Sequence, residues 1–263
     1  MPDPLARLGR KGVTFVEQLA AFLRLCWETI RAFFIIYPTG RRVVARVGVN
    51  QIYFTGVQAL PMLSLIAVLL GIVAVVNLAM FLPRFGAGGY MGRILIIVIL
   101  REFGPLLTAI ILITRSGTAI AADLASMSVN DEIAALKVMD ISVPRVIIAP
   151  RLIGAIVSCA CLTVGFVAVA ITSGFIAANC FTSLPLDAFA QNLVASIEGK
   201  DLVVSLAKSV GFGMIVALLS CHYGLLVKQS PTEIPQAVTR ATVASVVWCF
   251  VYATLLTVIS IRI

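Results

Sequence analysis

The stretch Arg101-Glu-Phe-Gly-Pro-Leu-Leu-Thr-Ala109, followed by Thr114-Arg-Ser-Gly-Thr-Ala-Ile-Ala-Ala-Asp123, decides how this chain folds. It places charged residues inside long apolar runs and continues through a polar segment to Pro150-Arg151. Around it the chain is mostly apolar, since 60% of its 263 residues are hydrophobic and 12% are charged. This composition is typical of a membrane protein with several spans rather than of a soluble domain.

Five apolar runs are long enough to cross a bilayer. A helix rises 1.5 Å per residue, so about 20 residues cross a hydrocarbon core of about 30 Å. The sequence therefore predicts an all-α membrane protein with five transmembrane helices. These spans lie at about 60–82, 91–121, 152–178, 201–226 and 241–261. The second span contains Arg101, Glu102 and Arg115, and the fourth contains Lys208.

The residues before the first span predict a cytoplasmic or interfacial region, 1–58. Between Val13 and Phe34 apolar residues recur at steps of three and four with charged residues between them, which indicates an amphipathic helix lying in the membrane interface. A helix packed on a soluble partner is the alternative. Residues 59–263 are then the five-helix transmembrane domain, which includes a short polar helix at about 129–139.

Basic residues predict the orientation of the chain in the membrane. With a cytoplasmic N-terminus, the inner segments hold fourteen of the twenty Lys and Arg residues and the outer segments hold four. The excess of Lys and Arg in inner loops predicts this orientation, and five spans place the C-terminus outside. Loops of this kind explain the formal charge of +8 without nucleic acid, because the basic residues are dispersed and have no aromatic platform between them.

Glu102 and Lys208 are predicted to lie at matched depth in separate helices. Glu102 is nine residues after Arg93, and Lys208 is eight residues after Lys200. At 1.5 Å per residue each is about 12–14 Å from the outer end of its span, so the two side chains could meet. Ionisable groups in spanning helices usually face a bundle interior or a wet cavity. A structural pair, or a pair of Arg101 with Glu102, is the alternative to a cavity that takes an amphiphile.

No motif in the sequence predicts that this chain is itself an enzyme. It has no G-x-x-x-x-G-K-[ST] loop, so it cannot bind ATP in that manner; if the chain is part of a pump, ATP with Mg²⁺ is bound by a separate subunit. The single histidine, His222, is not accompanied by a G-x-S-x-G or H-E-x-x-H motif, and we interpret it as a packing residue. The six cysteines lack the CxxC spacing of a metal or redox site, so no metal site is predicted.

Several segments resemble the signature of the MlaE family, the permease subunits of ABC transporters that work with MCE-domain lipid-binding proteins. The matching segments are Arg101-Glu-Phe-Gly-Pro-Leu-Leu-Thr-Ala, Arg115-Ser-Gly-Thr-Ala-Ile-Ala-Ala-Asp-Leu, Met127, Asp131-Glu-Ile-Ala-Ala-Leu and Pro150-Arg. The chain departs from the family pattern at Thr118, where Ser is usual, and at Asp123, where Glu is usual. It also departs at Ala125 and Asp140, where Gly is usual or common.

The resemblance implies a homodimeric permease of the bacterial inner membrane that moves phospholipid or a related lipid. Its implied partners are two ATPase subunits and a periplasmic MCE-domain assembly. A secondary transporter or channel for an amphiphilic solute is the alternative, although five spans without an inverted repeat argue against it.

The resemblance also implies roles for individual residues. The substrate site would include Glu102, Lys208 and Arg101. The coupling helix that docks on the ATPase would use Asp131, Glu132, Leu136, Lys137 and Met139. The structural motif positions are Gly104, Pro105, Arg115, Gly117, Asp123 and Arg151. Among these, Arg115 and Asp123 either brace the coupling helix or form an interfacial ion pair.

Overall fold

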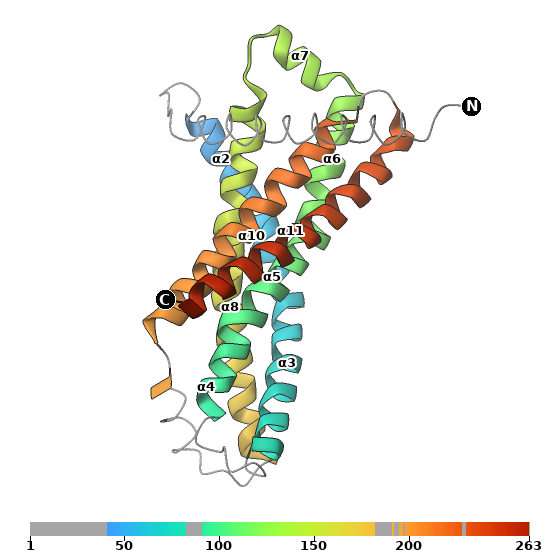
Figure 1. Cartoon of the computed structure of the whole chain (residues 1–263). Coiled ribbons are helices and arrows are strands. Elements are labelled where there is room, and N and C mark those ends of the chain that lie inside the picture. The colour runs from blue at the N-terminus through green and yellow to red at the C-terminus, as the bar shows by residue number, and fades with distance from the viewer. Residues whose placement is uncertain are drawn as a thin grey trace, which may run out of the picture.

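The computed structural model describes residues 41–82, 91–181, 191, 195–196, 198–227 and 230–262. Within these ranges every regular element is a helix (Figure 1). Five of the helical segments are long and apolar enough to cross a membrane, which confirms the predicted number of spans. They are Arg46–Phe81, Gly92–Val129, Pro144–Cys180, Gly199–Leu225 and Pro231–Ser260. The interfacial helix predicted between residues 13 and 34 lies outside the described residues, and the domain boundary at 58/59 stays a prediction.

Most spans are built from several helical elements that follow one another. The first contains α2 (Arg41–Thr55), the 3-10 turn η1 (Val57–Ala59) and α3 (Leu60–Phe81). The second contains α4 (Met91–Leu95), the π-helix η4 (Ile96–Phe103), α5 (Gly104–Leu112), the π-helix η5 (Ile113–Gly117) and α6 (Thr118–Val129). The third contains the π-helix η6 (Pro144–Ile148) and α8 (Ala149–Phe181). The fourth is α10 (Gly199–Leu225), and the fifth contains η7 (Pro231–Glu233) and α11 (Ile234–Arg262).

The first and second spans pack against α8 of the third, and small residues permit the closest contacts. At Gly71 in α3, an added Cβ would lie 2.1 Å from the carbonyl oxygen of Ala170 in α8. Leu63, Phe166 and their neighbours fill the interface with buried apolar side chains. Close helix approach of this kind is how spanning helices gain van der Waals contact when lipid is as apolar as their side chains.

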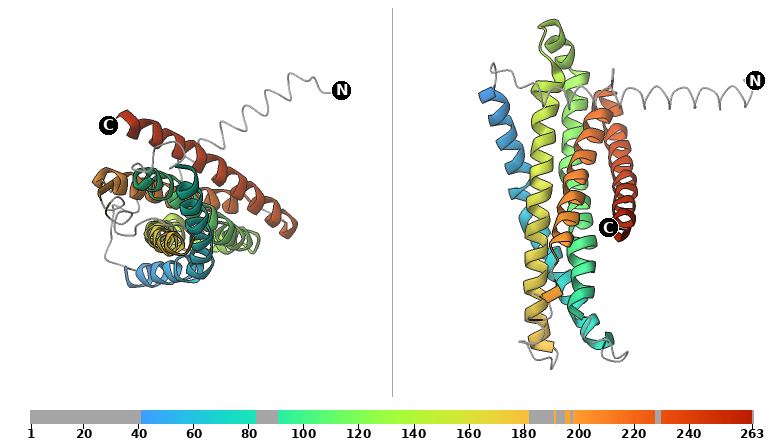
Figure 2. Two further views of the ribbon diagram at one scale, coloured as in Figure 1. Left: turned by 90° about the horizontal axis from the view of Figure 1, so that it is seen from below. Right: turned by 60° about the vertical axis from the view of Figure 1, so that its left-hand side comes forward.

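The short polar helix predicted at 129–139 is α7 (Glu132–Val138), which projects from one end of the molecule (Figures 1 and 2). It is flanked by Asp131 and Asp140, both in the left-handed backbone region with φ of 59° and 58°. Ile133 anchors it by packing into a buried cluster with Val143, Ile147 and their neighbours. The helix is thus tied to the ends of the second and third spans, while most of its surface stays exposed.

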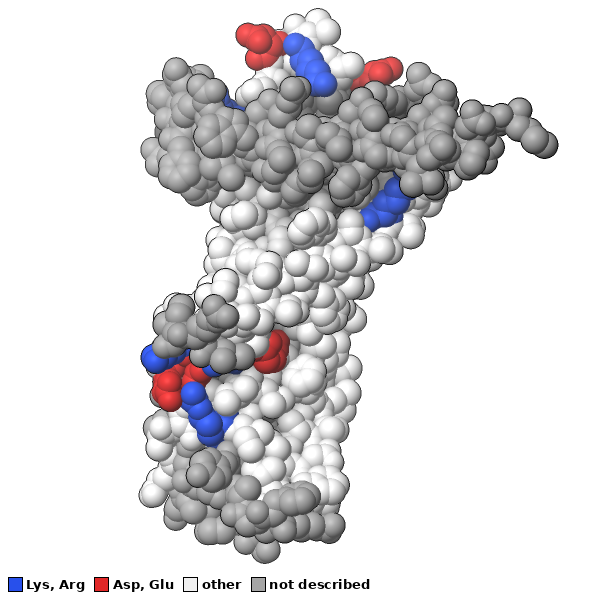
Figure 3. Space-filling view, in the orientation of Figure 1, with Lys and Arg blue, Asp and Glu red and all other residues white. Residues whose placement is uncertain are grey.

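The charged residues gather at two levels of the molecule. On the face drawn in Figure 3, Lys, Arg, Asp and Glu side chains lie around α7 and again in a lower group, and the described surface between them is mostly uncharged. The lower group lies where α10 begins and α11 ends, next to the start of the second span (Figure 1). The fold therefore brings the charges of three spans to one place.

Candidate functional site

The motif Arg101-Glu-Phe-Gly-Pro105 forms the turn of the second span where π-helix η4 gives way to α5. Proline has no N–H, so Pro105 cannot donate the usual helical hydrogen bond to the carbonyl of Arg101, four residues earlier. Lys208 supplies a donor instead, because its Nζ lies 3.1 Å from that carbonyl oxygen. The proline thus leaves the Arg101 carbonyl without its usual helical donor, and Lys208 of another helix donates to this carbonyl instead.

Lys208 is 1% exposed and uses its whole hydrogen-bonding capacity inside the protein. Its Nζ is 2.7 Å from both carboxylate oxygens of Glu102 and 2.8 Å from Oγ1 of Thr257 in α11. An ammonium has three N–H donors, and the carboxylate, the hydroxyl and the Arg101 carbonyl account for all three. The predicted meeting of Glu102 with Lys208 therefore occurs, and it joins the second, fourth and fifth spans.

Helical spacing places Asp201 on the same face of α10 as Lys208. The two residues are seven apart, which is two helical turns, and with Ser205 between them they form a buried row. Asp201 is 1% exposed and accepts from Nη1 of Arg93 at 2.9 Å. Its other oxygen is 3.6 Å from Nη1 of Arg101. The pair of Arg101 with Glu102 considered from the sequence is not formed, since Arg101 turns toward Asp201.

Arg101 has a second polar partner in the fifth span. Its Nη2 donates a hydrogen bond to Oγ of Ser260, and the Ser260 hydroxyl donates to the carbonyl of Thr257 at 2.8 Å. The Nε of Arg101 is buried without a partner. The guanidinium is thus held on one edge by Asp201 and Ser260.

A cavity of about 490 Å³ opens beside this charge network. Its charged wall contains Arg93, Arg101, Glu198, Lys200 and Asp201. Its remaining wall is mainly apolar and contains Val203, Val204, Ala207, Leu256 and Ile259 together with Ser260. We call this space the outer cavity, after the side of the membrane that the sequence predicts for it; its lining combines charged side chains with apolar ones.

The sequence-predicted substrate residues have different positions relative to the outer cavity. Arg101 is part of the described wall, whereas Glu102 and Lys208 are not. Lys208 contacts the backbone carbonyl of Arg101, and Glu102 contacts Lys208. Sequence reasoning missed Asp201, Thr257 and Ser260; the seven-residue spacing of Asp201 from Lys208 could have indicated the first, but no pattern marks the hydroxyl residues.

The motif glycines allow tight packing of the second span. An added Cβ at Gly104 would be 2.9 Å from both the carbonyl oxygen of Ile99 and a methyl carbon of Val167. At Gly117 it would be 3.1 Å from Oγ of Ser220 in α10. These positions therefore have a structural reason to be small, on either side of α5.

The remaining motif charges lie nearer α7, in the second span and at the start of α8. Asp123 forms an ion pair with Arg151 of α8, so it links two spans rather than pairing with Arg115. Arg115 instead donates from Nη2 to Oε1 of Gln58, at 2.8 Å, just before α3 begins. All four residues line a second cavity of about 300 Å³, which we call the inner cavity. Its other lining residues are Gln51, Phe54, Thr55, Ser116, Ala119 and Ile120.

The residues predicted to contact an ATPase are mostly on the open surface of α7. Asp131, Glu132, Lys137 and Met139 are exposed, and Met139 is 68% exposed. Leu136 is partly buried and packs on the cluster that anchors the helix. Sequence reasoning missed Val138, which is 88% exposed and adds to the apolar tip formed by Met139.

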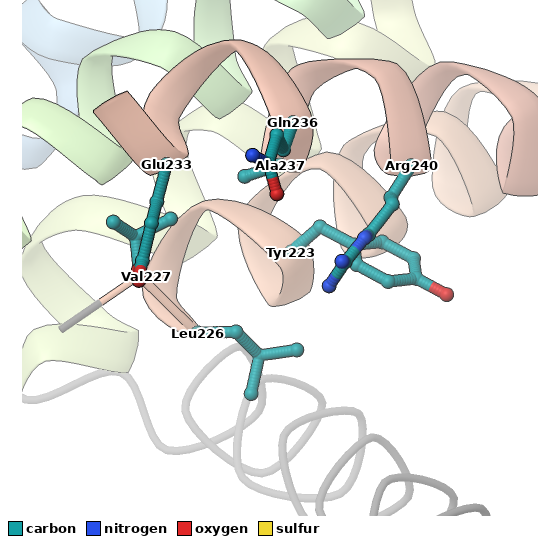
Figure 4. Close-up of a pocket in the computed structure, with 7 residues that line it drawn as sticks. All are labelled: Tyr223, Leu226, Val227, Glu233, Gln236, Ala237 and Arg240. Atoms are coloured by element: carbon teal, nitrogen blue, oxygen red, sulfur yellow. The ribbon is translucent and has the colours of Figure 1, made fainter. Parts of the chain in front are cut away.

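A third, smaller cavity of about 190 Å³ lies where α10 meets α11 (Figure 4). Glu233 reaches it from η7, Gln236 and Arg240 from the beginning of α11, and Tyr223 and Leu226 from the C-terminal end of α10. The predicted site residues do not contribute to its described wall. His222 is next to this region, is buried, and packs edge-on against Tyr223 with ring centroids 5.4 Å apart.

Five segments long enough to span a membrane, a charge network that joins three of them and a cavity with charged and apolar lining are the arrangement expected of a membrane permease. Residues 48–259 match the family model described as Permease MlaE. The chain belongs to the MlaE permease family, as its signature segments suggested.

Similar proteins come from bacteria and from a plant. A probable ABC transporter permease of Rickettsia typhi is 24% identical over 238 residues, which cover 90% of each chain. The intermembrane phospholipid transport system permease protein MlaE of Haemophilus influenzae is 27% identical over 74% of this chain and 75% of its own length. The chloroplastic protein Trigalactosyldiacylglycerol 1 of Arabidopsis thaliana is 24% identical over 77% of this chain and 58% of its own.

Proposed function

We propose that this chain is the permease subunit of an ABC transporter that moves phospholipid between the inner membrane and a periplasmic MCE-domain protein. Membership of the MlaE family and the names of the Rickettsia and Haemophilus relatives support this proposal. The observation that carries it is the outer cavity, whose lining combines charged and apolar side chains.

The outer cavity fits the two parts of a phospholipid. Arg101, Arg93 and Lys200 offer cationic donors to a phosphate group, which guanidinium groups bind with two parallel hydrogen bonds. Leu256 and Ile259 offer an apolar surface to acyl chains. Glu198 and Asp201 partly balance the positive charge, so a headgroup that carries an amine would also find an acceptor.

Glu102 and Lys208 contribute to this site through the backbone of Arg101 and do not line the outer cavity. Lys208 holds the Arg101 carbonyl and the Glu102 carboxylate at once, and this fixes the turn from which the Arg101 side chain projects. We therefore assign them a positioning role in substrate binding, with Arg101 as the residue that contacts the headgroup.

The remaining parts of the proposal concern partners and placement. The exposed surface of α7, including Asp131, Glu132, Lys137 and Met139, would dock on an ATPase subunit that binds ATP with Mg²⁺. Two copies of this chain would meet as a homodimer with two ATPase subunits. The chain would be a multi-pass protein of the bacterial inner membrane, with its N-terminus in the cytoplasm and its C-terminus in the periplasm.

A transport assay tests the proposal. The chain is reconstituted with its ATPase and MCE-domain partners in proteoliposomes, and transfer of a fluorescent phospholipid is measured with and without ATP. Filling the outer cavity by Ala207→Phe should reduce transfer about tenfold or more, because Ala207 is an exposed wall residue and the substitution removes no charge. Ala168→Phe is the matched control, since Ala168 is exposed on α8 outside both cavities.

Two results would contradict the proposal. Transfer that is equal in Ala207→Phe and Ala168→Phe would remove the outer cavity from the transport path. Transfer that is independent of ATP but follows an ion gradient would favour the secondary-transporter alternative.

A further inference from the structure

The inner cavity is separate from the outer cavity and is not used by the proposed function. Arg93 of the outer cavity and Arg115 of the inner cavity are 22 residues apart on the second span, which is about 33 Å along a helix. This distance is close to the thickness of a hydrocarbon core, about 30 Å. The two cavities have no lining residue in common, and we place the inner cavity in the bilayer half nearer α7.

Arg115 lacks an anionic partner in the described part of the chain. Its side-chain contact there is the neutral amide of Gln58, and the five ion pairs among the described residues do not include it. An arginine in a spanning helix normally faces a wet cavity or pairs with a negative group. The inner cavity supplies the first, and an anion held there would supply the second.

Arg151 adds a second guanidinium to the same cavity. One of its nitrogens pairs with Asp123, whereas its Nη1 is buried and has no hydrogen-bond partner. Because Nη1 makes no hydrogen bond, rotating the Arg151 guanidinium slightly toward the cavity would break none at this atom. Asp123 is 59% exposed and neutralises only one of the two arginines, so the cavity keeps a net positive charge.

Neutral polar groups complete a wall suited to phosphate oxygens. Gln58, Thr55 and Ser116 line the cavity and carry an amide and two hydroxyl groups. Two apolar lining residues are exposed, since Phe54 is 58% exposed and Ala119 is also exposed. A phosphate in this cavity would therefore have apolar surface beside it, which suits an ester-linked glycerolipid better than free phosphate.

We propose that the inner cavity binds the phosphate group of a phospholipid from the bilayer half nearer α7, with Arg115 as its main ligand. The acyl chains leave the cavity past Phe54 and Ala119. This is a second lipid site on the chain, additional to the outer cavity.

Photolabelling tests the site without any need for transport. The full chain is purified in nanodiscs, and a phosphatidylglycerol analogue with a diazirine next to its phosphate is cross-linked and located by peptide mass spectrometry. Adducts are expected in the segments that carry Phe54 and Ala119. Loss of a charge-assisted hydrogen bond should lower their yield about tenfold or more in Arg115→Gln, with partial recovery in Arg115→Lys.

Two further variants control for folding and for general charge effects. Ala119→Phe fills the cavity from an exposed position and leaves both arginines in place, so it should also lower the yield about tenfold. Arg240→Gln removes a cation from an exposed position on α11, outside the inner cavity, and should leave the yield unchanged.

The competitors decide which ligand the cavity takes. Unlabelled phosphatidylglycerol should suppress the adducts, whereas diacylglycerol and inorganic phosphate at equal concentration should not. Suppression by inorganic phosphate alone would show a free-anion site and overturn the proposal, as would yields that are unchanged in both Arg115→Gln and Ala119→Phe. Because this readout needs neither ATP nor the outer cavity, it can fail while the transport assay succeeds, or the reverse.

Discussion

At the scale of single residues, Lys208 is the most constrained side chain of the charge network. It is 1% exposed, and its ammonium contacts Glu102, Thr257 and the Arg101 carbonyl. A cation buried in this way is tolerable only while its counter-charge is present, because desolvation costs several kcal/mol for each ion. Glu102 and Lys208 should therefore depend strongly on each other.

A double-mutant cycle measures that dependence. Glu102→Gln leaves the buried ammonium without its carboxylate and should lower the free energy of unfolding by about 3–5 kcal/mol. Adding Lys208→Met removes the stranded charge and should restore most of this loss. The purified variants are unfolded in detergent, and unfolding is monitored as the fraction of protein that remains monodisperse. Costs that simply add in the double variant would show that the two side chains are not energetically coupled.

At the scale of elements, the contact of α10 with α8 depends on Gly213. An added Cβ there would be 2.7 Å from Cα of Ile156 and 2.8 Å from the carbonyl oxygen of Ala155. These are backbone atoms, so they cannot turn aside as a side chain could. Gly165, also in a spanning helix, provides a matched comparison, because an added Cβ there would have no neighbouring atom within 4 Å.

Gly213→Ala should separate the two helices and cost about 1–3 kcal/mol of stability, as overpacked cores do. Gly165→Ala should be neutral or stabilise the chain by up to about 1 kcal/mol, because alanine is the better helix former. Thermal unfolding of both variants in the same detergent checks the difference. Equal effects of the two substitutions would mean that the close approach at Gly213 does not limit packing.

The sequence predicts the elements better than it predicts their ends and faces. Length and hydropathy are sufficient for five spans, and counting residues from Arg93 and Lys200 is sufficient to match the depths of Glu102 and Lys208. Hydropathy predicts an end of the second span at about residue 121, but the helix continues to Val129. Hydropathy locates the end of the apolar run, whereas the helix extends beyond it. The spacing of Asp201 from Lys208 indicates that both lie on one face of α10, but no pattern in the sequence indicates that Arg101 binds Ser260.

At the scale of the whole molecule, the two charged levels predict how the chain lies in the membrane. The α7 level is expected in the cytoplasm, and the level at which α10 begins is expected at the periplasmic side, as the distribution of Lys and Arg indicates. Lys137 and Lys200 are exposed residues that mark these two levels. Each lysine can be replaced by cysteine without the loss of a buried contact.

Labelling with a membrane-impermeant maleimide then reports the orientation. In a cysteine-free chain, Lys200→Cys should react when the outer membrane of intact cells is made permeable, whereas Lys137→Cys should react only after the inner membrane is opened. The ATPase proposal adds a second expectation, because an ATPase seated on α7 should shield Lys137→Cys in opened membranes and leave Lys200→Cys reactive. Reaction of Lys137→Cys from the periplasm would invert the predicted orientation and place the inner cavity in the periplasmic half of the membrane.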